Sequence, residues 1–431
     1  MSTRTWLGHA PAVAQVQTWT LSGTWEADDT ITLTINGKAV AFTAGSTTIS
    51  DIITAMVTAY NLLSATTHPE FAEMTASKSG TTIFVLTADT AGRPFTASMT
   101  TADAGGAADD QRIEGDVTAT TGTAATANAG PYCWSTAANW SGGAVPVNSD
   151  DVVFENSSVD CLYGLDQSAV TLTSLTIKQS YSGSIGLPRT NTTGTSYVEY
   201  RDTYLKISAT TITGGQGDGS GSGRIKVNVG TAQTTASIHN TGSPKESGIE
   251  SFLLLGTHAS NAVNVTKGSV GIAVFAGEVS TVATLRVGYL TNQAGDASVR
   301  CGAGVTLTNV SKSGGKLDVS SDTTAVTQTA GDLIYRAGVP TALTILGGTL
   351  YYQSTGTVGA LVGGSGGGVA DFSQDNRAKT VTACYIYYGF TIRDPFGVVT
   401  WTAGIDCVEC GAEDVKLYLG KHKRLTPGAV A

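Results

Sequence analysis

Six cysteines are the residues whose type and spacing bear most directly on chemistry. Cys407 and Cys410 have the C-x-x-C spacing of half a zinc site. A structural zinc site needs four ligands, and because the sequence holds no second C-x-x-C, Cys384 and His422 would have to complete it through the fold. A redox pair is a second alternative, and plain strand or turn cysteines are the interpretation that the sequence favours. The other cysteines are too widely spaced for a small disulfide framework, so we expect free, buried thiols at Cys133, Cys161 and Cys301.

Three pairs of neighbouring aspartates suggest a glycosidase or a calcium site. They are Asp28-Asp29, Asp109-Asp110 and Asp150-Asp151. Neighbouring residues on a strand point to opposite faces, so such pairs make poor acid/base partners. We therefore expect these aspartates to form turns and caps.

Isolated acids and tyrosines leave polysaccharide cleavage or binding open as an alternative. Cleavage would require consecutive coils of the fold to bring together two of Asp202, Asp318, Asp332 and Asp371. Sugar-binding grooves often use indole faces, yet no tryptophan lies between Trp140 and Trp401. Five tyrosines could take the place of tryptophans as sugar-binding platforms, but we expect them to pack at an inter-subunit surface or a solenoid edge. They are Tyr351, Tyr352, Tyr385, Tyr387 and Tyr388.

Other catalytic motifs are missing from the sequence. The glycine-rich runs at 214–223 and 363–368 lack the Lys-Ser/Thr ending of a phosphate loop, so we expect turns or loops there. No G-x-S-x-G turn accompanies the five histidines, which are His9, His68, His239, His258 and His422. The sequence thus predicts no catalytic, cofactor-binding or metal-binding residue, no cofactor, and a protein that is not an enzyme.

The composition favours β-structure and argues against nucleic acid as a partner. Only 14% of residues are charged and glycine occurs 53 times, whereas helical domains carry more straight-chain residues. Phosphate binding needs a concentrated basic surface, but the net charge is −9 and the pI is near 5.0. The basic run Lys421–Arg424 is interpreted as a solvated tail, with contact to an acidic partner as the alternative. No stretch approaches the roughly 18 apolar residues of a membrane span, and the N-terminus lacks a signal-peptide core, so we expect cytoplasmic synthesis and no membrane insertion.

Residues 17–100 are predicted to form a small α+β module of order ββαβββ. The alternating runs Thr30–Ile35 and Lys38–Phe42 flank Asn36-Gly37 and predict a hairpin, because both central residues of a type I′ turn need positive φ. Three more strands are expected over residues 71–76, 82–88 and 94–99. One helix is expected between the hairpin and these three strands, behind a Thr48 or Ser50 cap; its buried face would consist of Ile49, Ile52, Ile53, Met56, Val57 and Tyr60.

Residues 101–130 are mostly Ala, Thr, Gly and Asp and predict a linker. Trp134 and Trp140 follow in a turn that leads through Pro146 into the apolar strand Asp151–Phe154. A terminal coil of a stack exposes apolar surface and unpaired strand groups, so we expect the two indoles to cap such an end. Two ordinary core tryptophans are the alternative.

From residue 168 onward, short apolar strands recur without helices and predict a parallel β-helix or β-solenoid. A Gly-x-Leu step at Gly315, Gly331 and Gly348 recurs at intervals of 16 and 17 residues, as expected for coils of two or three short strands. Antiparallel β-sandwich domains are the alternative. Examples of the expected strands are Leu172–Ile177, Leu205–Ile207, Ile225–Val229, Phe252–Leu255 and Ala283–Val287.

The predicted organisation is mainly β. Its parts are an N-terminal arm (1–16), an attachment module (17–100), a linker (101–130), a tryptophan cap (131–160), a β-solenoid (161–395) and a C-terminal cap or tail (396–431).

Three stretches resemble virion components of tailed bacteriophages and prophages. The first is the opening run Arg4–His9, and the second is the Ile35–Lys38 hairpin with Pro69–Glu73 and Thr87–Gly92 downstream. The third, which runs from Trp134 and Trp140 to Phe154, is similar to entries into β-solenoids of phage proteins and bacterial surface passengers.

The resemblance implies a structural protein on the exterior of a virion, made in the cytoplasm of the host bacterium. It would be a capsid decoration, cement or spike protein that is attached through its N-terminal region and displays the solenoid. Its implied partners are major capsid or tail proteins and further copies of itself, in a homotrimer. The alternative is a tail fibre or tailspike that binds or cleaves host surface glycan.

Overall fold

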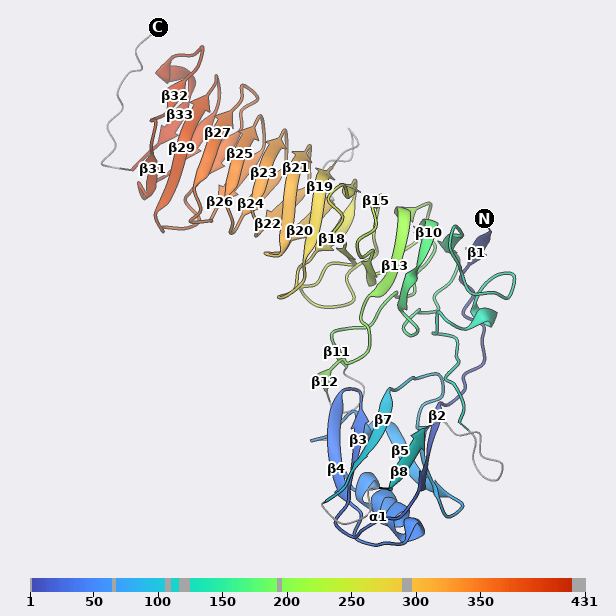
Figure 1. Cartoon of the computed structure of the whole chain (residues 1–431). Helices are drawn as coiled ribbons and strands as arrows, with labels where there is room; N and C mark the ends of the chain where they lie inside the picture. Colours follow the sequence, from blue (N-terminus) through green and yellow to red (C-terminus); the bar gives the residue numbers. More distant parts are fainter. Residues whose placement is uncertain are drawn as a thin grey trace.

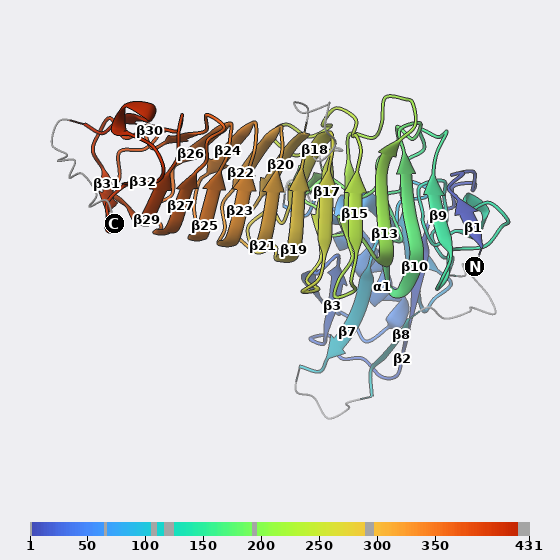
Figure 2. The same ribbon diagram turned by 90° about the horizontal axis from the view of Figure 1, so that it is seen from above.

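The computed structural model describes residues 2–63, 67–104, 110–115, 125–191, 196–288 and 297–420. The protein is mainly β and has two parts, a small module and a long stack of strands. The module lies beside the first coils of the stack, which extends away from it to the C-terminal end (Figure 1 and Figure 2). The predicted β-solenoid is confirmed, and the β-sandwich alternative is wrong because the strands of the stack pair in parallel.

Two parallel ladders form the solenoid, and from β13 to β31 successive strands alternate between them. Over this range each strand pairs with the one two positions ahead in the chain, so each coil adds one strand to each ladder; in the last coil both β31 and β32 pair with β29, and β33 pairs with β30. The first ladder contains β9 (Asp151–Phe154), β10 (Asp166–Lys178), β13 (Leu205–Gln216), β15 (Thr235–Ile238), β17 (Ala262–Val265), β19 (Ser280–Val287), β21 (Val305–Lys312), β23 (Thr323–Gln328), β25 (Pro340–Ile345), β27 (Val358–Gly363), β29 (Lys379–Ile386), β31 (Val399–Trp401) and β32 (Asp406–Cys407). The second starts on β13 and contains β14 (Ile225–Asn228), β16 (Phe252–Leu255), β18 (Gly268–Ile272), β20 (Ala297–Cys301), β22 (Lys316–Val319), β24 (Asp332–Tyr335), β26 (Thr349–Tyr352), β28 (Val369–Asp371), β30 (Thr391–Arg393) and β33 (Lys416–Tyr418).

The Gly-x-Leu step marks where one coil stacks on the next. Leu333 pairs in register with Leu317 on one side and Leu350 on the other, and all three side chains are buried. Gly331 has a φ of 73°, and a Cβ atom there would lie 2.2 Å from the Gly315 carbonyl oxygen. Only glycine tolerates both the left-handed backbone and this close approach, so the repeat is confirmed as a stacking signal.

One continuous apolar core runs through the solenoid. A typical column consists of Val310, Val326, Leu343 and Leu361, which pair in register from coil to coil and are buried. Each coil covers the apolar surface of the coil before it, as in other repeat architectures.

Lys312 is a buried cation at the end of β21, and it should make stability depend on pH. Its Nζ donates to the Ala330 carbonyl oxygen at 2.6 Å, and burial lowers its pKa to about 8 although Asp332 opposes the shift. Between about pH 8 and pH 10 the unfolded chain holds this proton and the folded chain does not, so stability should rise with pH, by up to about 1.4 kcal/mol per unit. Lys312→Met should lose this rise and be the more stable protein at pH 7. Urea unfolding of both proteins across this range measures the difference, and parallel curves would contradict the prediction.

Three tryptophans close the first coil of the solenoid. The ring centroids of Trp134 and Trp140 lie 4.5 Å apart, and Trp6 adds a third ring 5.1 Å from Trp140. The buried Asn139 side chain, from η2 (Ala137–Asn139), accepts a hydrogen bond from the Ala10 backbone and so ties the N-terminal segment to this cluster. Trp6 was predicted to belong to a separate arm, but it lies in the solenoid core.

The module is an insertion between the first strand of the solenoid and the remainder. β1 (Thr3–Thr5) pairs in parallel with β9, after which the chain leaves for the module. The outgoing and returning segments are joined where Val13 N–H donates to the Ala129 carbonyl oxygen at 2.7 Å. Each part keeps its own apolar core.

Two antiparallel sheets and one helix make up the module. The Asn36-Gly37 hairpin is confirmed, because both residues have positive φ and the strands pair from Ile35 with Lys38 onward. The helix α1 (Ile49–Asn61) begins after Thr48 as predicted and buries most of the predicted face. The sheets are β5-β6-β2-β8 and β4-β3-β7, from β2 (Val16–Ser22), β3 (Thr30–Ile35), β4 (Lys38–Thr43), β5 (Met74–Ser79), β6 (Ile83–Ala88), β7 (Ala97–Ala102) and β8 (Arg112–Gly115).

Two strands of the module were not predicted. β2 begins at Val16, on the boundary of the expected arm, and β8 lies inside the expected linker. β8 is short and polar, and it is held by antiparallel pairing with β2 rather than by an apolar pattern of its own.

Candidate functional site

The module and the solenoid meet at a buried polar network that we call the junction network, formed by Glu73, Arg93, Glu199 and Arg201 with nearby tyrosines. Glu73 ends the short helix η1 (Phe71–Glu73) of the module. The other side comes from the solenoid segment that carries β11 (Thr190–Asn191) and β12 (Tyr197–Val198), which reaches toward the module (Figure 1). Figure 1 thus shows a loop of one coil docked on the module, and side-chain contacts fix it there.

The Glu73 carboxylate is the centre of the junction network. It accepts hydrogen bonds from Tyr197 and Arg201, and from the Tyr200 hydroxyl at 3.2 Å. Arg93 forms a further ion pair with Glu73 at 3.2 Å. The side chains of Glu73 and Arg201 are 9% and 8% exposed, so this is a buried charge pair whose separation would be costly.

Arg201 is held between two carboxylates and an aromatic ring. Its Nε lies 3.4 Å from Glu199, and its guanidinium carbon lies 4.4 Å from the centre of the Tyr200 ring. Burial alone would lower the pKa of Arg201, but Tyr200, Glu73 and Glu199 raise it above its usual range. Burial and the hydrogen bond to Glu73 raise the pKa of Tyr197, so both groups keep their protons at neutral pH.

A groove of about 470 Å³ lies beside the junction network. Its module side includes Asn36 and Phe95, and its solenoid side includes Tyr163, Tyr200 and Asp202. A second hollow of about 320 Å³ on the solenoid shares Arg201 and Asp202 with it. Aromatic rings beside carboxylates are the usual features of a site for a polar ligand such as a sugar.

Asp166 and Asp202 are brought together at this groove, but they are not arranged for acid catalysis. Lys206 Nζ lies 2.5 Å from Asp202 and 3.6 Å from Asp166. Hydrogen bonds from Ser168 lower the pKa of Asp166, whereas a glycosidase acid needs a raised pKa. The arrangement suits binding better than hydrolysis.

The other isolated acids are not brought together for cleavage. Asp318 forms a bidentate ion pair with Arg336, with Nε to Oδ1 at 2.7 Å, and Asp371 lies 3.7 Å from Arg393. Asp318 and Asp371 occupy the same column three strands apart, so their separation is about 14 Å, too far for either type of glycosidase. Asp332 is exposed at the start of β24.

Asp29 and Asp150 take the turn role expected from the sequence, whereas Asp151 begins β9 and accepts a hydrogen bond from the Ser174 hydroxyl on β10. Asp150 accepts hydrogen bonds from Ser2 and Val147 backbone N–H groups, which together with Arg4 lower its pKa although burial opposes the shift. Asp110 accepts from the Thr24 backbone at 2.9 Å. Asp109 lies outside the described residues.

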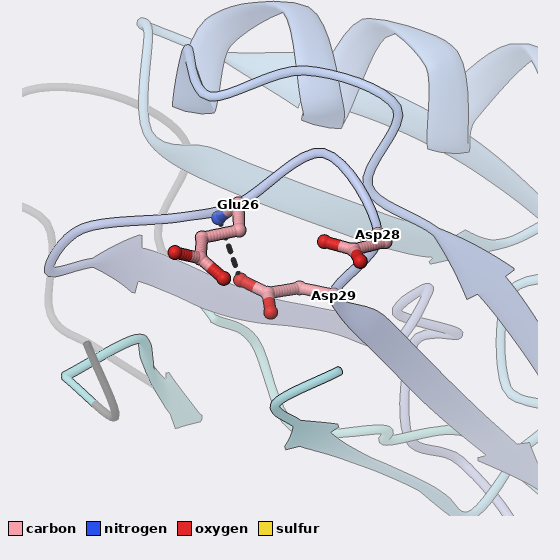
Figure 3. A group of neighbouring side chains, drawn as sticks. All are labelled: Glu26, Asp28 and Asp29. Atoms are coloured by element: carbon pink, nitrogen blue, oxygen red, sulfur yellow. Dashed lines mark hydrogen bonds between the residues drawn. The ribbon is translucent and has the colours of Figure 1, made fainter. Parts of the chain in front are cut away.

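One acidic cluster, shown in Figure 3, consists of Glu26, Asp28 and Asp29, whose carboxylate oxygens lie within 4.8 Å of one another. Asp29 is buried and accepts the Glu26 backbone N–H at 2.8 Å, which closes the turn before β3. Oxygen ligands of this kind suit a hard cation such as calcium. The hydrogen bond gives Asp29 a structural role in the turn.

The cysteines are free thiols in the structure. Cys384 lies on β29 next to β32, which ends at Cys407, so the fold brings it toward the C-x-x-C pair. A shared metal ion would require the sulfur atoms of Cys384, Cys407 and Cys410 to lie within 4.8 Å of one another. Within the described ranges, these three thiols do not form such a group. His422 and the Lys421–Arg424 run lie outside those ranges.

The tyrosines considered for sugar binding divide between core and surface. Tyr352 is buried and stacks on Tyr335 at 5.5 Å, so it is a core residue. Tyr385 and Tyr388 are exposed near the C-terminal end of the solenoid. The rings that line the groove, Tyr163 and Tyr200, were not predicted; the dense run of charged and aromatic residues at 197–202 in a chain of few charges was the available signal.

Comparisons with protein families, curated proteins and solved structures find no match to this chain. No helix in the part of the chain that the structure describes is long and apolar enough to cross a membrane.

Proposed function

We propose that this chain is a non-enzymatic structural protein of a bacteriophage particle. In this proposal the N-terminal module attaches to other virion proteins, and the solenoid projects from the exterior surface or covers it. The observation that carries the proposal is the build of the molecule, a long solenoid with a compact module fixed at its first coils by the buried junction network. A fixed angle between an anchor and a rod suits display of a surface.

Ion pairs between coils add to this interpretation. Arg336 links neighbouring strands through Asp318, and Arg393 links them through Asp371. Such links resist lateral bending of the stack, which suits a scaffold more than a site that must open and close.

Removal of the module without damage to the first coil tests the attachment role. In the test variant, a short Asn-Gly turn joins Val13 directly to Ala129. Because Val13 and Ala129 are already hydrogen-bonded to each other, this variant keeps β1 and Trp6 in place. We expect this variant to show the circular dichroism spectrum of a folded solenoid and to be missing from purified phage particles. Antibodies should label the full-length protein on the exterior of the same particles. Equal incorporation of the variant would overturn the proposal.

Self-association into a trimer is part of the proposal. Large side chains are exposed around the last coils, where they would be covered by further copies; they are Tyr385, Tyr388, Phe396 and Tyr418. Sedimentation of the purified protein distinguishes a monomer from a trimer.

Host glycan binding is a second candidate function, favoured by the groove beside the junction network. Tyr163 and Tyr200 line this groove, where Asp202 offers hydrogen-bond acceptors, and the faces of the Tyr200 ring are covered by Arg201 and Tyr197. Binding of host surface polysaccharide that is lost in Tyr163→Ala, with no release of reducing ends, would support it. Cleavage of the polysaccharide would instead support a tailspike enzyme.

A further inference from the structure

Cys407 and Cys410 differ from the other four cysteines in exposure. Those four are buried, whereas Cys407 and Cys410 are partly exposed. Reagents in solution can therefore reach these two thiols in the folded protein, and the remaining thiols are shielded by the solenoid core and the tryptophan cap.

The chain folds back on itself between the two residues. The Val408 N–H and the Cys410 thiol both point to the Ile386 carbonyl oxygen, at 2.9 Å and 3.7 Å. Glu409 has a φ of 55°, a left-handed conformation that reverses the chain direction. Cys407 is itself the register partner of Ile386, so this turn returns the Cys410 sulfur to the point of β29 where Cys407 pairs.

We propose that Cys407 and Cys410 form a disulfide bond when the protein meets a low-molecular-weight disulfide such as oxidised glutathione. One thiolate attacks the small disulfide, forms a mixed disulfide and releases one small thiol. The second thiolate then attacks the mixed disulfide at the protein sulfur and releases the second small thiol. The two cysteines lose two electrons and two protons in total, and the small disulfide gains them.

The surroundings of the pair keep both thiols protonated near neutral pH. Burial and the neighbouring charges raise the pKa of both thiols, with Asp406 acting on Cys407 and Asp414 and Glu413 acting on Cys410. Attack on a small disulfide needs a thiolate, so the link should form slowly at neutral pH and faster at alkaline pH. In this respect the pair differs from a catalytic C-x-x-C pair, whose lowered pKa keeps a thiolate available near neutral pH.

This link would fasten the last coil of the solenoid. β32 pairs with β29, and Cys407 and Cys410 pack against the end of the apolar core together with Trp401 and Leu417. The strands of this coil have neighbours on one side within the described residues. The disulfide is expected wherever the protein meets the oxidant, whatever particle or cell it belongs to.

Alkylation and peptide mapping of the full-length protein test the proposal. Reduced, folded protein should react with iodoacetamide at Cys407 and Cys410 alone. After prolonged incubation with oxidised glutathione at about pH 9, where the thiolate fraction is larger than at neutral pH, we expect the intact mass to fall by two hydrogen atoms and this reactivity to disappear. A tryptic map should then show the 407–410 link, and reduction should restore both thiols.

Single substitutions provide the controls. Cys407→Ser and Cys410→Ser should each leave one reactive thiol, which acquires a glutathione adduct instead of an internal link. Cys384→Ser is the matched control, because it removes the nearest other thiol and should leave the 407–410 link unchanged. Three results would overturn the proposal: persistent reactivity of both thiols after oxidation, a Cys384–Cys407 link in the map, or stoichiometric zinc retained by the reduced protein and lost in Cys407→Ser.

Discussion

Replacement of Glu73 by glutamine is expected to detach the module from the solenoid while both parts remain folded. Glutamine has the shape of glutamate but cannot neutralise Arg201 or Arg93, which both face this carboxylate. Loss of one partner from a buried ion pair costs about 3–5 kcal/mol, and here the cost arises mainly at Arg93, because Arg201 keeps its ion pair with Glu199. The two cores are separate, so we expect this cost to fall on the contact between the parts.

Small-angle scattering and urea unfolding measure the outcome. The Glu73→Gln protein should have a larger radius of gyration and two unfolding transitions, one for each part. Glu70→Gln is the matched control, since Glu70 lies three residues away and pairs at 3.3 Å with Lys38, which is 38% exposed; this change should cost about 1 kcal/mol or less and leave the scattering unchanged. Equal behaviour of the two variants would mean that the junction network does not hold the parts together.

Substitution of Trp6 by alanine is expected to destabilise the first coils of the solenoid by about 3–5 kcal/mol, the usual cost of removing a buried aromatic side chain. The Trp6 ring is 1% exposed and lies 5.7 Å from Phe154, and its indole N–H donates to the Val159 carbonyl oxygen at 3.0 Å. Removal of the ring leaves a cavity against Trp140 and takes away one of two hydrogen bonds to the Val159 carbonyl oxygen, the other coming from the Tyr181 hydroxyl at 2.9 Å. For the same reason, a fragment that begins at residue 131 should be less stable than the intact solenoid.

Hydrogen exchange read by mass spectrometry locates the effect. Trp6→Ala should reduce the protection of amides in β9 and β10, with little change in the module. Trp25→Ala, the same substitution at an equally buried site in the module core, should show the opposite distribution. Unchanged protection of β9 in Trp6→Ala would show that the N-terminal segment is not part of the cap.

Local signals in the sequence were sufficient for several elements. Asn36-Gly37 between alternating strands predicted its hairpin because positive φ at both positions is a property of the residues themselves. The helix followed from apolar positions at helical spacing, and the Gly-x-Leu step followed from a repeat interval close to one coil. In each case the information lies within a few residues or recurs at a fixed interval.

The junction network and the N-terminal strand were decided by the tertiary structure. β1 pairs with β9 across 148 residues of sequence. Because β1 is only three residues long, it has no periodicity from which this pairing could be predicted. Glu73 and Arg201 are likewise 128 residues apart, and each alone reads as an ordinary surface charge. The sequence determined that the chain would stack as a solenoid, because apolar strands and glycines repeat at the coil interval. Which distant segments close its end and hold its module depended on contacts that form only when the coils are in place, since burial turns these side chains into specific partners.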